Sequence, residues 1–218
     1  MRRLFLLLAL VLAIGTWLGF SESGLSALAR LAGAASGGRF AIEQPSGRLV
    51  GPLGFARLSW KEPGLEVDVT DLRIDWSPAT LFEKRLAIGE LAAARVRVDI
   101  ASSDAASEPP ASLNLPVAVD IGKIAISRLD YGQAFSAGDL RGVFNSDGQI
   151  HRLSDFSAQL GLARISGSAE LHGAAPLPLR ADASVTGKLD EQPVRLAISA
   201  AGPLDRILLK IAAQEGVR

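Results

Sequence analysis

The sequence contains no cysteine and few aromatic residues, and its positive and negative charges cancel. Without cysteine the chain can form no disulfide, no reactive thiolate and no cysteine metal site. A net charge of zero over 218 residues provides no field that would attract nucleic acid, so we expect no nucleic-acid partner. Aromatic residues make up only 6% of the chain, and the 22 glycines and many aliphatic residues favour strands and turns.

A long uncharged run, Leu4 to Phe20, follows two arginines at the N-terminus. As a helix it would be roughly 25 Å long, close to the hydrocarbon thickness of a bilayer. The positive-inside rule keeps the arginines in the cytoplasm and places the following chain on the far side of the membrane. We therefore predict a transmembrane signal-anchor over residues 1–22. The alternative is a cleavable signal peptide, with Ala27-Leu28-Ala29 as the cleavage site.

Residues 23–36 have the spacing of a short amphipathic helix. Ser23 is a candidate N-cap, and Gly37-Gly38 would end the helix. Such a helix could plug the apolar end of a sheet or lie in the headgroup region of a membrane.

The stretch from Gly64 to Trp76, GLEVDVTDLRIDW, alternates apolar and charged residues with the period of a half-buried strand. The phase of this alternation slips by one residue at Thr70 and Asp71, which a β-bulge or a tight turn would absorb. One face of the strand is therefore apolar and the other is charged.

Similar runs, separated by Gly, Pro and Asn-Ser-Asp-Gly turns, recur to the C-terminus. They predict an all-β chain that forms an elongated antiparallel curled sheet, a β-taco with an apolar groove, after the two N-terminal helices. The last run ends abruptly, as a truncated repeat array would. We predict five segments: the signal-anchor 1–22, the amphipathic helix 23–36, a first β-repeat block 37–100, a linker 101–112 and a second β-repeat block 113–218.

No motif of the sequence is typical of catalysis, and we expect neither enzyme activity nor a metal or cofactor. His151 and His172 are too far apart in the sequence for a metal-binding pair, so we expect both on the surface. The carboxylates of the Gly64 to Trp76 stretch alternate with apolar residues, which indicates a solvated sheet face rather than an acid–base site.

An antiparallel sheet usually buries its apolar face under a second layer, but this sequence has almost no helix and few aromatic residues to cover it. Curling over its own apolar face would leave a groove for an alkyl chain. Exposing a chain of about sixteen carbons to water costs on the order of 12 kcal/mol, at about 0.8 kcal/mol per methylene. The predicted lipid-binding residues of this groove are Val67, Val69, Leu72, Ile74, Val96, Val98, Val117, Val119, Ile124 and Ile126.

Four motifs occur in order after the first helices: Gly-Arg-Leu-x-Gly-Pro-Leu from Gly47, the Gly64 to Trp76 stretch, Ser-Pro-x-x-Leu from Ser77, and Leu-x-Ile-x-x-Leu-x-Ala-x-x-Val from Leu86. In these motifs the chain resembles the N-terminal portion of the TamB family, the inner-membrane subunits of the translocation and assembly module of Gram-negative bacteria, which is similar to the wider AsmA-like group. The resemblance is best over residues 1–100. Members of this family usually run to many hundreds of residues and end in a C-terminal domain that meets the barrel partner, so we expect the 218 residues to be either an N-terminal fragment or a short relative.

The resemblance implies a single-pass protein of the bacterial inner membrane, with a cytoplasmic N-terminus and most of its mass in the periplasm. It also implies an outer-membrane barrel partner, a role in outer-membrane protein assembly and secretion, and phospholipid transport between the membranes. A different function remains open on the residues alone. The sheet edge could pair with a client β-strand, which would make the protein a periplasmic scaffold without lipid transport.

Overall fold

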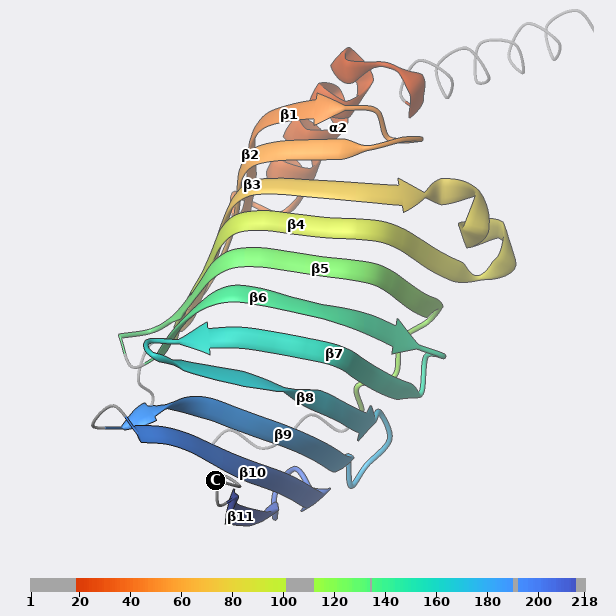
Figure 1. Cartoon of the computed structure of the whole chain (residues 1–218). Coiled ribbons are helices and arrows are strands. Elements are labelled where there is room, and N and C mark those ends of the chain that lie inside the picture. The colour runs from red at the N-terminus through yellow and green to blue at the C-terminus, as the bar shows by residue number, and fades with distance from the viewer. Residues whose placement is uncertain (1–18, 101–111, 134, 190–191, 215–218) are drawn as a thin grey trace, which may run out of the picture.

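The computed structural model of the chain describes residues 19–100, 112–133, 135–189 and 192–214. Figure 1 shows the strands stacked in chain order, with helix α2 beside the first of them, so the all-β prediction is confirmed. The elements are α2 (Glu22–Ala35), β1 (Phe40–Gly47), β2 (Leu53–Glu62), β3 (Leu65–Ser77), the 3₁₀ helix η1 (Pro78–Glu83), β4 (Arg85–Ile100), β5 (Ala118–Tyr131), β6 (Phe135–Ser146), β7 (Ile150–Leu160), β8 (Ala163–His172), β9 (Pro178–Leu189), β10 (Gln192–Pro203) and β11 (Leu208–Gln214).

Helix α2 packs against β1. Its N-cap is Ser21 rather than the predicted Ser23, and the Ser21 Oγ accepts a hydrogen bond from the Gly24 N–H at 2.9 Å. Leu25 and Ala29 are buried on the side of the helix that meets the sheet. The described helices include none that is long and apolar enough to cross a membrane, and the predicted anchor 1–22 lies largely outside the described residues.

All eleven strands form one sheet, in which neighbours in space are neighbours in the sequence. The strand pairs are antiparallel, as predicted, except β4 and β5, which are parallel. A parallel pair requires a crossover connection that returns from the end of the first strand to the opposite end of the strands, where the second strand begins. The crossover runs from Ile100 to Ala118 and includes the predicted linker 101–112, of which only Ser112 is described; it forms a bridge with Ala174.

The phase slip predicted at Asp71 is present, but it is not a bulge. The pairing of β3 with β2 and with β4 keeps the same register on both sides of Asp71, whose φ of 50° bends the strand. Each ladder between neighbouring strands from β1 to β6 lacks a residue pair at the same level along the strands as Asp71. We call this row of residues the crease: Gln44, Ala56, Asp71, Ala94, Ser127 and Asp139.

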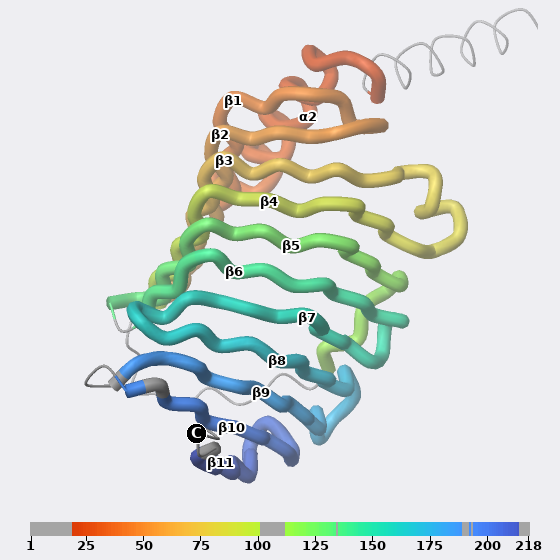
Figure 2. Tube along the Cα trace, viewed as in Figure 1, coloured from red at the N-terminus to blue at the C-terminus, as the bar shows by residue number. Residues whose placement is uncertain are grey.

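The sheet bends at the crease, and Figures 1 and 2 show the upper strands turning back sharply at the left of the view. Two outward-facing residues follow each other at the crease on each strand, such as Ala94 and Arg95, which are both exposed. The apolar side chains before and after the crease therefore share one face. Phe55, Leu72 and Ala93 form a buried cluster there and contact apolar residues on both sides of the bend, so the concave face is the apolar one.

Candidate functional site

Six of the ten predicted groove residues lie on the concave face of β3 and β4. Val67 pairs with Val98, and Val69 pairs with Val96, on one side of the crease. Leu72 and Ile74 lie on the other side, where they belong to the buried cluster or pack against it. The sheet thus brings these six residues together on one face.

The remaining four predicted residues lie in or beside β5. Ile124 and Ile126 pair with Leu91 and Ala93, and Val119 pairs with Leu86, so all three continue the concave face of β4. Val117 is half-buried and immediately precedes β5, so this predicted groove residue lies just outside the strand.

The concave face extends much further than these ten residues. A row of paired apolar residues crosses it from β3 to β11, a span of about 38 Å at strand spacings of about 4.8 Å. The row consists of Trp76, Ile88, Ile121, Phe144, Leu153, Ala169, Ala181, Ala200 and Leu209.

Sequence reasoning did not list the lining on β2 and on β6–β11. On β2, Phe55 and Leu58 both face inward because Ala56 belongs to the crease, so simple alternation misassigns one of them. On β8–β10 inward-facing and outward-facing residues alternate regularly, with Ala163, Ile165 and Gly167 facing inward on β8. The sequence alone could therefore have identified the lining residues of these strands.

Most of this lining is only half-buried. Leu72 is 9% exposed, whereas the other nine predicted residues are all partly exposed. Apolar side chains in this state still contact water, and burying them further is favourable at about 25 cal/mol per Å². The concave face can therefore gain free energy by contact with an apolar ligand.

The convex face carries the charged residues, as predicted for Glu66, Asp68, Asp71 and Asp75. Cross-strand ion pairs connect its strands. They include Arg57–Asp68 at 2.6 Å, Lys61–Glu66 at 2.6 Å, Arg85–Asp120 at 2.9 Å, Lys123–Glu90 at 2.7 Å and Arg152–Glu170 at 2.8 Å. The Arg152 hydrogen bond lowers the pKa of Glu170, with a smaller contribution from His172. The arginine or lysine of each pair is exposed, so each pair contributes little to stability.

His151 is not the exposed surface residue that the sequence predicted. It is half-buried and stacks on Phe144, with ring centroids 6.3 Å apart. Its Nδ1 lies 2.8 Å from Ser146 Oγ, and its Nε2 lies 3.0 Å from the Leu113 carbonyl oxygen. His151 therefore fastens the segment before β5 to the β6–β7 hairpin, a structural role.

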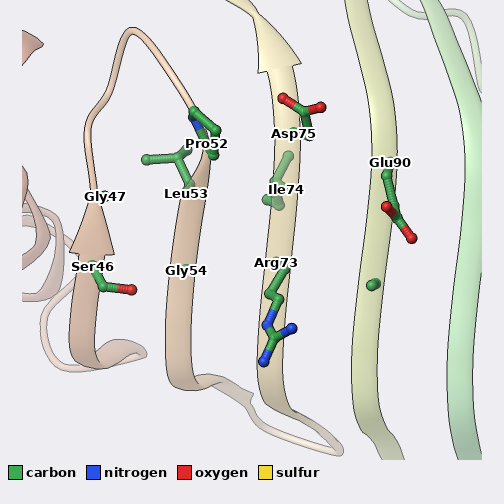
Figure 3. Close-up of a pocket in the computed structure, with 10 residues that line it drawn as sticks. Ser46, Gly47, Pro52, Leu53, Gly54, Arg73, Ile74, Asp75 and Glu90 are labelled. Atoms are coloured by element: carbon green, nitrogen blue, oxygen red, sulfur yellow. The ribbon is translucent and has the colours of Figure 1, made fainter.

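A hollow of about 560 Å³ lies on the convex side of β1–β4, and Figure 3 shows its lining. Arg73 and Asp75 come from β3 and Glu90 from β4, and glycines such as Gly54 leave room between them. Glu90 is already paired with Lys123 at 2.7 Å. Within the described ranges, no three His, Asp or Glu side chains are grouped so that they could hold a metal ion.

Comparison with known families gives one result. The model of the TamB N-terminal domain matches residues 7–142, which is more than half of the chain. The chain belongs to the TamB family. No curated protein and no solved structure matches it. The match to the TamB domain ends within β6, and β7–β11 continue the same TamB sheet without interruption.

Proposed function

We propose that this TamB-family protein is a periplasmic carrier of acyl chains, anchored in the bacterial inner membrane by its N-terminal segment. The observation that supports this most is the apolar row from Trp76 to Leu209 on the concave face. Acyl chains bound along it would be shielded from water, at a saving of about 0.8 kcal/mol per methylene.

Within the translocation and assembly module, the protein would work with an outer-membrane barrel partner. Its role would be to move phospholipid between the membranes and to support outer-membrane protein assembly, without catalysis. The ten predicted groove residues, together with the further lining on β6–β11, would form the lipid-binding surface.

Native mass spectrometry of the full chain, purified from bacterial cells in mild detergent, tests this proposal. We expect co-purifying phospholipid in the wild type and its loss in Val98→Asp, because a charge on the apolar face is costly to desolvate. Ala94→Asp is the matched control on the same strand, since Ala94 is exposed on the convex side. A lipid-free wild type, or equal loss in both variants, would contradict the proposal.

A scaffold that pairs with client strands is the second candidate, and the edge strand β11 favours it. β11 is the last strand of the described sheet, and Leu209 and Ile211 on it are 57% and 60% exposed. Edge strands of this kind can accept another strand. Val98→Asp should leave such pairing intact, so a client that binds Val98→Asp normally while lipid is absent would favour the scaffold.

A further inference from the structure

An arginine-rich hollow lies on the convex face of β4 and β5, close to the end of the β5–β6 hairpin. Its volume is about 580 Å³. Arg95 and Arg128 face each other across the parallel β4–β5 pair, and Arg97 lies two residues nearer the strand end. The lining contains Arg95, Arg97, Asp99, Arg128, Asp130 and Phe135.

The arrangement of charges is unusual, because like charges placed opposite each other in a sheet are destabilising. Asp130 offsets this by accepting hydrogen bonds from Arg128 Nε at 2.9 Å and from Ser136 Oγ at 2.8 Å, and by pairing with Arg95 Nε at 3.3 Å. These hydrogen bonds, first that of Arg128 and then that of Ser136, hold the pKa of Asp130 below its usual value. A single carboxylate therefore serves two guanidinium groups.

Among the described residues, Arg97 is the arginine of this hollow whose positive charge is not paired with a carboxylate. Its in-register neighbours are Asp68 on β3 and Asp130 on β5. Asp68 is taken by Arg57 at 2.6 Å. The Arg97 side chain is exposed and makes no ion pair within the part of the chain that the structure describes.

On the opposite side of the sheet from the hollow, the concave face extends to the same ends of β4, β5 and β6. Val98, Tyr131 and Phe135 pair in a row across β4, β5 and β6. Tyr131 is 48% and Phe135 43% exposed, and Phe135 also lines the hollow. Aromatic side chains suit a boundary between apolar and aqueous surroundings. The apolar face and the arginine-rich hollow therefore meet at this rim of the sheet.

We propose that Arg97, with Arg95 and Arg128, binds the phosphate of a glycerophospholipid whose acyl chains lie on the concave face. The inference rests on the proposed function and adds the headgroup class and its binding residues. The planar guanidinium group matches two phosphate oxygens at once, and Asp130 holds two of the three arginines in position. The phosphate would lie over the rim, beside Tyr131 and Phe135.

The test compares binding of phosphatidylglycerol and of diacylglycerol with the same acyl chains to the full chain in mild detergent. Arg97→Gln should weaken phosphatidylglycerol binding about threefold, and a variant with all three arginines changed to Gln about tenfold, as expected for exposed charge pairs. Diacylglycerol binding should not change. Arg164→Gln, an exposed arginine on β8, is the matched control and should bind both lipids like the wild type.

Several results would overturn the inference. Equal phosphatidylglycerol binding in the wild type and the triple variant would do so, as would an equal loss of both lipids, which would indicate a structural effect. Inorganic phosphate that competes as well as the whole lipid would identify the site as one for free phosphate. A wild type that binds neither lipid would instead contradict the proposed function itself. If the wild type binds diacylglycerol but changing the arginines has no effect on phosphatidylglycerol binding, only the proposed headgroup site is wrong.

Discussion

The sheet has two regions that differ in backbone and in lining. In the creased half, β1–β6, each ladder skips a pair at the crease. In the regular half, β8–β11, the ladders run without a break. Phe55, Leu72, Ala93 and Ala137 are buried in the creased half, whereas no described strand residue of β8–β11 is buried.

The lining differs in volume as well. The concave face of the creased half carries bulky residues such as Trp60, Ile88 and Ile121, while β8 and β9 carry small ones such as Ala169, Ala181 and Ala183. Bulky side chains that meet across a bend stabilise the fold, and small side chains on an unbent face leave room for a ligand. The creased half therefore contains more of the buried packing, and the small residues of the regular half leave more room on the concave face.

The largest effect should come from Leu72→Ala in the creased half. Leu72 is 9% exposed in the buried cluster, so its truncation should lower the free energy of unfolding by about 2–5 kcal/mol. The control Leu196→Ala, at a half-buried position in the regular half, should cost about 1 kcal/mol. Denaturant unfolding of the full chain, followed by circular dichroism, measures both. Equal losses would show that the two halves are not packed differently.

Ala183→Trp should fill the concave face of the regular half and weaken phospholipid binding about tenfold, which corresponds to about 1.4 kcal/mol. Ser184→Trp, on the opposite face of the same strand, is its control. Titration with fluorescent phosphatidylglycerol measures the affinity. If Ala183→Trp binds phosphatidylglycerol like the wild type, the assignment of space to the regular half is wrong.

Asp71→Val tests the crease itself. Asp71 has a φ of 50°, and a β-branched residue in this conformation should lower the free energy of unfolding by about 1 kcal/mol. Asp71→Gly should not show this loss from side-chain strain, because glycine accepts positive φ. The same change in the regular half, Asp182→Val, should stay within about 0.5 kcal/mol because Asp182 is an exposed strand residue. Thermal unfolding measures the stability of the three variants. If Asp71→Val leaves the free energy of unfolding unchanged, the crease does not depend on this residue.

The smallest effect concerns pH at the turn of the β6–β7 hairpin, at the border of the creased half. Backbone N–H groups of Ile150 and Gln149 donate to Asp147 Oδ1, each at 2.8 Å, and lower the pKa of Asp147. A lowered pKa means that the carboxylate stabilises the fold above the unfolded-state pKa, and that this stabilisation is lost as the pH falls through the folded-state pKa. Hydrogen exchange at Gln149 and Ile150 should therefore lose protection on acidification, relative to a mid-strand amide in β10. Asp147→Ala should remove the pH dependence, and unchanged dependence in this variant would assign it to another group.

Much of the fold could be predicted because the pattern of single strands is visible in the sequence. The alternation around Val67 and Val98 predicts which side chains share a face, and the structure places them as pairs. The slip at Asp71 was also visible, but its alignment with Gln44 and Asp139 was not, because pairing register depends on contacts between strands.

Features that depend on distant contacts could not be predicted. The parallel β4–β5 pair depends on contacts between two separate strands, and no local pattern of the sequence encodes the direction in which they pair. His151 is half-buried because it contacts the carbonyl of Leu113, 38 residues earlier in the chain. The arginine-rich hollow likewise depends on the parallel pairing of Arg95 with Arg128.

The most direct test of lipid binding on the concave face is photocrosslinking in bacterial cells. A photoreactive amino acid is placed in the full chain at Val69 or Val185 on the concave face, and at Ser184 on the convex face. The account predicts phospholipid adducts from Val69 and Val185 and none from Ser184, with the stronger signal at Val185. Equal adducts from all three positions, or none from any, would contradict the claim that the concave face carries acyl chains.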